Sequence, residues 1–175
     1  MDPIQVDERG TLTWRGKTVR AALGRNGVRA GKQEGDGATP LGCFPLRQVY
    51  YRPDRVERPV TALPVSVLTP SDGWCDDPAD RAYNTFVALP YPAHTESLFR
   101  DDHLYDLMVV LGYNDAPPVP RKGSAVFMHL AREDYAPTDG CIALGRDDLL
   151  DILRTASEDT LLCMRGGSFP DSARY

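Results

Sequence analysis

The chain has 175 residues, enough for one domain with a sizeable core and too few for two ordinary domains. Hydrophobic residues make up 42% of it, which is typical of a globular protein and excludes a disordered chain. Its formal net charge is −5 and no block of Lys and Arg offsets it, so neither nucleic acid nor an anionic membrane is an expected partner.

The first part of the chain is rich in strand and turn signals. Residues 11–22 alternate apolar and polar side chains around Arg15-Gly16, which predicts a β-hairpin with a short turn. Residues 31–42 are polar and rich in glycine, and therefore predict a loop. This loop is expected to lead into a strand over 44–51.

The middle of the chain alternates predicted strands with long connections. A short β-branched strand is expected over 64–68, followed by a long loop over 69–80. The sequence Y-D-L-M-V-V-L over 105–111 predicts a buried strand, and S-A-V-F-M-H-L over 124–130 predicts a second one. The segment between them, 112–123, is rich in proline and is expected to be a loop.

The last part of the chain changes period. Apolar residues recur at helical spacing within 147–156, which predicts a helix, and a final strand is expected over 160–164. One helix among many strands, with 15 prolines in the chain, argues against a helical bundle. The sequence therefore predicts a mainly β fold: a single β-sandwich or barrel-like domain over residues 1–175, with one or two short helices.

The N-terminus and the cysteines bear on the cellular compartment. The opening MDPIQVDERG lacks a basic segment followed by an apolar stretch, and no apolar run reaches the ~18–20 residues of a membrane helix. We therefore expect a cytoplasmic protein, with a periplasmic location as the alternative if the printed chain starts after a leader. Because the chain is not short and no secretory context is visible, all four cysteines are expected to be free thiols: Cys43, Cys75, Cys141 and Cys163.

A histidine and a cysteine form the strongest candidate for chemistry. His129 lies near the end of a predicted strand, and Cys141 follows Gly140 in a loop before the predicted helix. A thiol with a pKa of ~8.5 needs a base near neutrality, and an imidazole is suited to that role. The N–H groups of Gly140 and Cys141 would then stabilise an oxyanion. Taken singly, each of these residues is also compatible with a packing role.

Two segments carry a family resemblance. The sequence M-H-L-A-R-E-D-Y-A-P-T-D-G-C-I-A-L over 128–144 resembles the catalytic signature of YkuD-type L,D-transpeptidases. The sequence G-D-G-A-T-P-L-G-C-F over 35–44 resembles the T-P-x-G-x-F element of the same family, and the order of the two is the family's. The resemblance implies a mostly β catalytic domain, a cysteine nucleophile without a cofactor, and acyl-enzyme chemistry at the L,D bond of a peptidoglycan stem peptide.

By position, the resemblance also implies catalytic roles. Cys141 takes the place of the nucleophile and His129 that of its base. The backbone carbonyl of Leu130 would orient the imidazole, and Gly140 would supply an oxyanion donor together with Cys141.

Other positions concern the binding of the peptide. Thr138 takes the family's Ser/Thr place, and Asp139 precedes the Gly-Cys pair. Ala143 stands where most members have an Arg or Asn that helps to hold the donor peptide. We therefore expect other side chains to bind the substrate, and the candidates are Arg25, Lys32, Arg81, Tyr83, Asn84 and Arg132.

The acceptor decides the reaction that the acyl-enzyme completes. Water gives an L,D-carboxypeptidase, and an amine gives an L,D-transpeptidase. The expected cytoplasmic location favours hydrolysis of soluble muropeptides during murein recycling. Two alternatives stay open: a catalytically inactive peptidoglycan-binding module, and a metal-dependent peptidase using His94, His103 and His129, although no H-E-x-x-H spacing is present.

Overall fold

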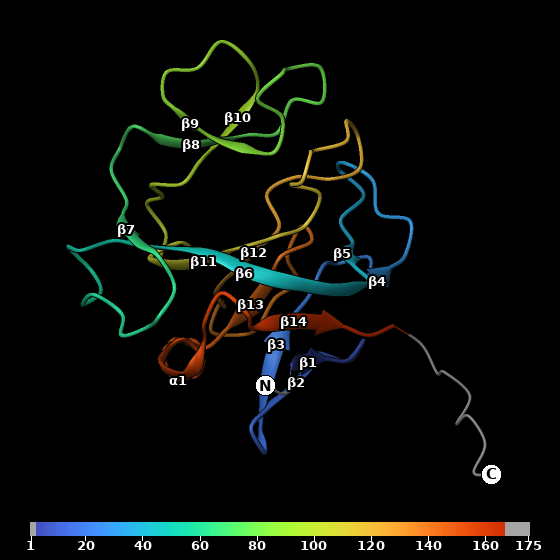
Figure 1. Ribbon diagram of the computed structural model, residues 1–175, viewed down its shortest axis with the longest axis vertical. Helices are drawn as coiled ribbons and strands as arrows, with labels where there is room; N and C mark the ends of the chain where they lie inside the picture. The colour runs from blue at the N-terminus through green and yellow to red at the C-terminus, as the bar shows by residue number, and fades with distance from the viewer. Residues whose placement is uncertain (1–2, 167–175) are drawn as a thin grey trace.

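The computed structural model describes residues 3–166, which form short strands and one helix. The elements are β1 (Ile4–Val6), β2 (Thr11–Trp14), β3 (Lys17–Ala22), β4 (Val28–Arg29), β5 (Thr39–Pro40), β6 (Gly42–Tyr51), β7 (Val65–Val67), β8 (Asp72–Cys75), β9 (Thr85–Ala88), β10 (Thr95–Ser97), β11 (Leu107–Leu111), β12 (Phe127–Leu130), β13 (Ile142–Leu144), α1 (Arg146–Thr155) and β14 (Leu161–Met164). The mainly β class expected from the sequence is confirmed (Figure 1).

The main sheet closes on itself. Its strand order is β11-β12-β13-β3-β2-β1-β14-β6-β7, and β11 also pairs with β6. The long strand β6 makes this closure because its first half pairs with β14 and its second half with β11. The result is a barrel-like sheet, as the sequence predicted.

The hairpin expected over residues 11–22 is formed by β2 and β3. Its two turn residues, Arg15 and Gly16, have φ values of 48° and 76°. Positive φ at both positions is the geometry that matches the right-handed twist of a tight hairpin. The helix expected over 147–156 is also present, as α1.

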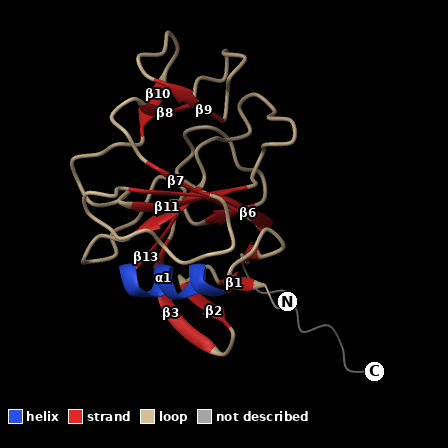
Figure 2. Cartoon of the chain, turned by 60° about the vertical axis from the view of Figure 1, so that its left-hand side comes forward, coloured by secondary structure: helices blue, strands red, loops and turns tan. Residues whose placement is uncertain are grey.

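The strands β12 and β13 separate two apolar cores. They run parallel, with Met128 opposite Ile142 and His129 opposite Ala143. Side chains alternate along a strand, so Met128 and Ile142 enter the core that α1 covers, whereas Phe127 belongs to a second core on the other side. His129 and Ala143 share the side of Phe127. Figure 2 shows α1 beside β13 at one end of the molecule and the strands β8, β9 and β10 at the other end.

A small sheet of β10, β8 and β9, in that order, lies beyond the second core (Figure 1). The sequence analysis was wrong here, because it predicted one long loop over 69–80 where β8 lies. The three strands are short and show no clear alternation, so nothing local marks them. Tertiary contacts hold them instead: the Trp74 ring packs edge-on against Phe127 at 5.1 Å, and its indole N–H donates to the Asn84 side chain.

The cysteines form one bond that the sequence analysis did not foresee. Cys43 on β6 and Cys163 on β14 are directly opposite each other, and a disulfide joins them. The expectation of four free thiols was therefore wrong for this pair, because a sequence separation of 120 hides their proximity. Cys75 and Cys141 are free and buried. No helix in the part of the chain described here is long and apolar enough to cross a membrane.

Candidate active site

The loop that carries Cys141 is closed by the side chain of Thr138. The Thr138 hydroxyl donates to the Cys141 carbonyl at 2.7 Å and accepts the Gly140 N–H at 3.1 Å. The Thr138 backbone N–H donates to Leu23, which fixes the loop to the end of β3. We refer to residues 138–141 as the nucleophile loop. An oxyanion role for the Gly140 N–H stays a prediction. It requires the hydrogen bond from this N–H to the Thr138 hydroxyl to open.

The two sequence motifs meet at the nucleophile loop. Gly140 has a φ of +141°, and a Cβ on it would lie 2.7 Å from the Ala38 carbonyl oxygen. Ala38 belongs to the loop over residues 31–40, which Asp36 holds by accepting the N–H groups of Gln33 and Ala38. The Lys32 ammonium also donates to Asp36, at 2.9 Å. The T-P motif therefore supports the backbone that presents the cysteine.

His129 is buried and oriented by the backbone. Its Nδ1 lies 2.9 Å from the carbonyl oxygen of Leu130, which can only accept, so Nδ1 carries the proton. The other ring nitrogen, Nε2, is left with its lone pair. Burial lowers the pKa of His129 to about 4, so the imidazole is neutral near neutral pH.

The sulfur of Cys141 has two backbone partners. The thiol donates to the Ala125 carbonyl at 3.3 Å and accepts the Phe127 N–H at 3.4 Å. The pKa of Cys141 is raised to about 12. Burial is the main cause, and the nearby charge of Glu96 is the second. The resting pair is therefore a neutral thiol and a neutral imidazole. No hydrogen bond joins the two side chains in this state, within residues 3–166.

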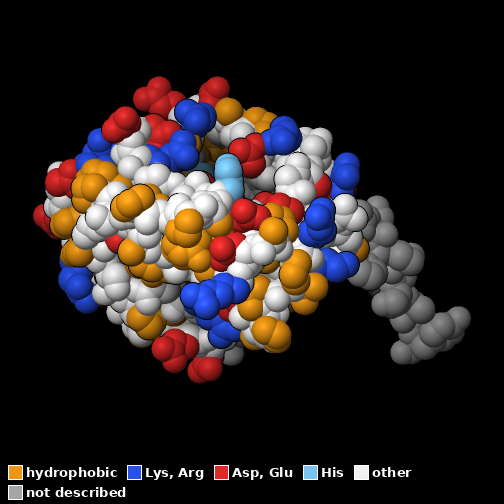
Figure 3. Space-filling model, turned by 90° about the horizontal axis from the view of Figure 1, so that it is seen from above, with side chains coloured by type: hydrophobic (Ala, Val, Ile, Leu, Met, Phe, Trp, Pro, Cys, Tyr) orange, Lys and Arg blue, Asp and Glu red, His pale blue; other side chains and the backbone are white. Residues whose placement is uncertain are grey.

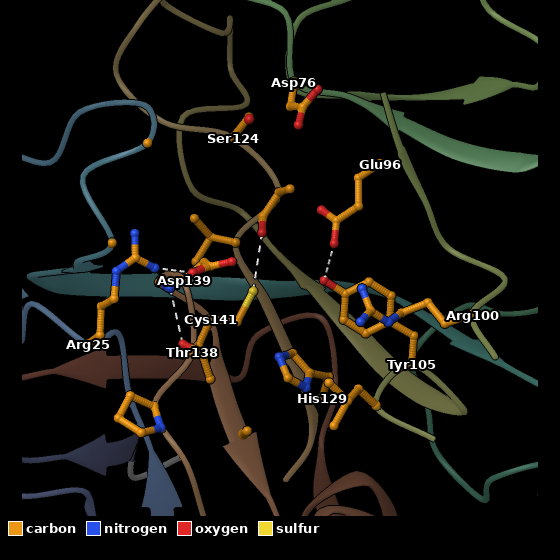
Figure 4. Close-up of a pocket in the computed structure, with 18 of the residues that line it drawn as sticks. Arg25, Asp76, Glu96, Arg100, Tyr105, Ser124, His129, Thr138, Asp139 and Cys141 are labelled. Atoms are coloured by element: carbon orange, nitrogen blue, oxygen red, sulfur yellow. Dashed lines mark hydrogen bonds and ion pairs between the residues drawn. The ribbon is translucent and has the colours of Figure 1, made fainter. Parts of the chain in front are cut away.

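Both side chains reach one cavity of about 690 Å³ (Figure 4). The cavity is bounded by the strands β12 and β13, the nucleophile loop, the loop over 31–40 and the small sheet. Acidic and basic side chains stand side by side on the face seen from above (Figure 3). The lining of the cavity combines the Cys141 thiol and the His129 imidazole, both buried, with charged groups of both signs, as a site for a zwitterionic ligand requires.

Five of the residues expected to bind the peptide line this cavity: Arg25, Lys32, Arg132, Thr138 and Asp139. Arg25 forms an ion pair with Asp139, and Lys32 forms one with Asp36. Arg132 is exposed at the rim and makes no ion pair within residues 3–166. It is therefore the cation best placed to receive a carboxylate of a bound peptide.

Three other candidates do not line the cavity: Arg81, Tyr83 and Asn84. Asn84 is buried and its amide is already satisfied, since it accepts from Trp74 and Ala125 and donates to two backbone carbonyls. The Tyr83 hydroxyl donates to Glu34 at 2.5 Å and accepts the Gly123 N–H. The side chains of Tyr83 and Asn84 therefore hold neighbouring segments together, and neither of them reaches the cavity where a substrate would bind.

Sequence reasoning missed several residues of the cavity wall. No motif in the sequence marks Glu96 on β10. Its carboxyl nevertheless accepts a hydrogen bond from the Tyr105 hydroxyl beside Cys141 (Figure 4). The Tyr105 ring packs against the His129 ring at 5.1 Å. Arg100 stacks over Tyr105 and pairs with Asp102. Only the fold of the small sheet brings these residues to the site, so no local pattern could reveal them.

The three histidines considered as metal ligands do not converge. His94 contacts Asp76 at 2.5 Å, and His103 contacts the Ala131 carbonyl at 2.9 Å. Within residues 3–166, no group of three or more His, Cys, Asp or Glu side chains is placed to hold a metal ion.

The chain matches the model of a protein family and is similar to solved structures of one protein. The model of the L,D-transpeptidase catalytic domain, YkuD, matches residues 4–162. The helical cell shape determining protein Pgp2 from Campylobacter jejuni is similar in structure, with 14% identity, a TM-score of 0.46 and coverage of 95% of this chain and 48% of that one. A substituted variant of Pgp2 gives the same identity and TM-score, with 95% and 47% coverage. The chain thus spans about half the length of these structures, and no curated protein matches it significantly.

Proposed function

Because the chain belongs to the YkuD family of L,D-transpeptidase catalytic domains, whose members act on peptidoglycan, we propose that Cys141 forms an acyl-enzyme with a stem peptide. The bond attacked is the L,D bond before the terminal D-alanine. One observation carries the proposal: His129 on β12 and Cys141, directly before the neighbouring parallel strand β13, line the same cavity.

The first half of the reaction uses the lone pair on His129. Since Nδ1 is fixed on the Leu130 carbonyl, Nε2 takes the thiol proton while the sulfur attacks the peptide carbonyl. The thiol points to the Ala125 carbonyl at rest, so it must first turn towards the imidazole. The imidazolium then protonates the leaving amine of D-alanine, and the acyl group stays on sulfur.

Hydrolysis completes the proposed reaction. Nε2, again neutral, removes a proton from water as the water oxygen attacks the thioester carbonyl. The C–S bond then breaks, the tripeptide leaves as the free acid, and the imidazolium returns the proton to the Cys141 sulfur. Ala143 lies opposite His129 and carries only a methyl group, so it cannot hold a peptide as a longer polar side chain would. A site that must bind one stem peptide tolerates this change more easily than a site that positions two. We therefore favour L,D-carboxypeptidase activity over transpeptidation.

A cytoplasmic location is part of the proposal, and one feature weighs against it. Disulfides such as Cys43–Cys163 are typical of oxidising compartments. Trapping the thiols in intact cells, followed by non-reducing mass analysis, tests the location: two trapped cysteines indicate an oxidising compartment, and four indicate the cytoplasm.

The reaction is tested with the purified protein and a tetrapeptide muropeptide. The expected products are the tripeptide and free D-alanine, and a large excess of amine acceptor should leave hydrolysis dominant. Mainly cross-linked dimer from the tetrapeptide alone would show that transpeptidation is the true reaction. EDTA should not change the rate, whereas loss of activity with recovery on zinc would favour the metallopeptidase alternative.

Two variants test the residues. Cys141→Ala and His129→Ala should each lose hydrolysis and transfer, because the thiolate feeds both routes. His103→Ala is the matched control, because this exposed histidine does not line the cavity and should keep full activity. Full activity of Cys141→Ala would end the proposal.

A further inference from the structure

The carboxyl group of Glu96 is an unusual part of the cavity wall. Glu96 lies on the edge strand β10, opposite Trp74, and its carboxyl points to the Tyr105 hydroxyl at the side of the cavity where Cys141 lies (Figure 4). Burial raises the pKa of Glu96, because a carboxylate there has lost much of its water. Glu96 is half-buried and lines the same cavity as Cys141, so its carboxyl is an acceptor at the reacting centre.

Glu96 differs from the carboxylates that pair with the cavity's cations. Three of the four Lys and Arg side chains that line the cavity are paired with a carboxylate: Arg25 with Asp139, Lys32 with Asp36 and Arg100 with Asp102. Glu96 forms no ion pair within residues 3–166, and its hydrogen-bond partner there is a neutral phenol. The charge of Arg100 lowers the pKa of Glu96, but its guanidinium pairs with Asp102, so Glu96 has no cation of its own among residues 3–166 and a bound ammonium would supply one.

We propose that Glu96 is the specificity-determining residue that binds the free ammonium group at the side-chain end of the substrate's diamino acid. This inference rests on the proposed function and names the part of the stem peptide that the site recognises. The residue whose carbonyl Cys141 attacks is the diamino acid, so its side chain starts at the Cα next to the reacting carbonyl carbon. Glu96 and Cys141 line the same cavity, as an ammonium on that side chain requires (Figure 4).

The same contact links binding to the reactivity of Cys141. After burial, the charge of Glu96 is the next cause that raises the pKa of Cys141. A substrate ammonium on Glu96 offsets this charge, so the thiol ionises more easily when the cognate side chain is bound. Glu96 therefore keeps the nucleophile protonated in the empty site and favours its ionisation with the correct substrate.

The selectivity is tested with two tetrapeptides that differ by one group. One carries L-lysine at the third position, and the other carries Nε-acetyl-lysine, which lacks the charge. The wild-type protein should hydrolyse the free lysine peptide with a kcat/KM about tenfold higher or more. Glu96→Gln keeps an acceptor for the Tyr105 hydroxyl but loses the charge, so the two kcat/KM values should become equal, mainly through KM. Equal values in the wild type, or an unchanged preference in Glu96→Gln, would overturn the inference.

Glu34 provides the matched control. It lines the same cavity, and its carboxylate also accepts from neutral groups, the hydroxyls of Tyr83 and Ser124. Glu34→Gln should keep the preference for the free ammonium. Loss of the preference in Glu34→Gln together with its retention in Glu96→Gln would place the ammonium site at Glu34 and refute the assignment.

Alkylation separates this inference from a failure of the proposed function. In the absence of peptide, Glu96→Gln should raise the rate at which iodoacetamide labels Cys141, about threefold or more at pH 8, because a negative charge beside the thiol is removed. A structural role for Glu96 predicts no such increase. If the wild type hydrolyses neither peptide, the proposed function fails, and the alkylation rate still reports whether Glu96 controls Cys141.

Discussion

At Gly140 the backbone adopts a φ of +141°, and the Ala38 carbonyl oxygen occupies the space that a Cβ would need. Both conditions exclude a side chain, and both arise from contact with a loop about a hundred residues earlier in the chain. The motif T-D-G-C thus requires glycine for a reason that the local sequence does not contain.

Gly140→Ala should lower the free energy of unfolding by about 1–3 kcal/mol, because it forces an unfavourable φ and moves the Ala38 carbonyl. Urea unfolding measures this loss, and activity should fall with it because the nucleophile loop moves. Gly31→Ala is the control, since nothing lies within 4 Å of its added Cβ and it should change stability little. Equal stability of the two variants would contradict the argument.

Cys141 should react selectively and with a steep dependence on pH. Only Cys75 competes as a free thiol, and it is 0% exposed, whereas Cys141 lines the cavity. Because burial raises the pKa of Cys141 to about 12, its thiolate fraction should rise about tenfold per pH unit between pH 7 and 10 without a plateau. Iodoacetamide labelling at several pH values, read by peptide mass, measures the rate. A plateau near pH 9, or faster labelling of Cys75, would show that the thiol is not held protonated.

At the scale of single residues, the sequence motifs singled out His129 and Cys141, and the structure brings both to one cavity. Their catalytic roles stay predictions. Glu96 and Tyr105 could not be found in this way, because their meeting depends on where the fold places the small sheet. Asn84 was misread for the opposite reason: its polar side chain suggested binding, and burial shows that the fold uses all of its hydrogen-bonding capacity.

At the scale of elements, strong periodicity made most of the main sheet predictable. The segments with long apolar runs or clear alternation became β6, β11, β12 and the hairpin. The strand β13 was missed because it has only three residues and directly follows the nucleophile loop. The small sheet was missed because side-chain contacts across the chain, and not local propensity, hold its strands.

Asn84 connects the small sheet to the main sheet, and its loss should weaken this connection. Its amide binds the Trp74 indole on β8, the backbone after β11 and the Ala125 N–H before β12. Asn84→Ala should lower the free energy of unfolding by about 2 kcal/mol or more, since several buried polar groups lose their partner. Activity should fall as well, because Ala125 borders Cys141. Thr85→Ala, at an exposed neighbour, should change both by little, and similar losses in the two variants would refute the connection.

At the scale of the whole molecule, the sequence predicted the architecture but not its covalent closure. Turn signals, apolar strands and one late helix are sufficient to predict a mainly β, barrel-like chain. The pairing of β6 with β14 is different, because it joins segments from opposite ends of the chain. A non-local pairing of this kind leaves no trace in composition or period, and the disulfide follows directly from it.

The Cys43–Cys163 disulfide should stabilise the fold without taking part in catalysis. It closes a loop with a sequence separation of 120 residues, so it restricts the unfolded chain strongly, and bonds of this kind typically contribute about 2–4 kcal/mol. Neither cysteine lines the cavity. The double variant Cys43→Ser, Cys163→Ser should therefore unfold at lower urea concentration while its kcat/KM stays near that of the wild type at 25 °C. The oxidised wild type, treated with a mild reductant, should shift in the same direction, whereas the double variant should not respond. Unchanged stability in the double variant would show that β6 and β14 are held by their hydrogen bonds and packing alone. Loss of activity without loss of stability would require a functional role for the disulfide.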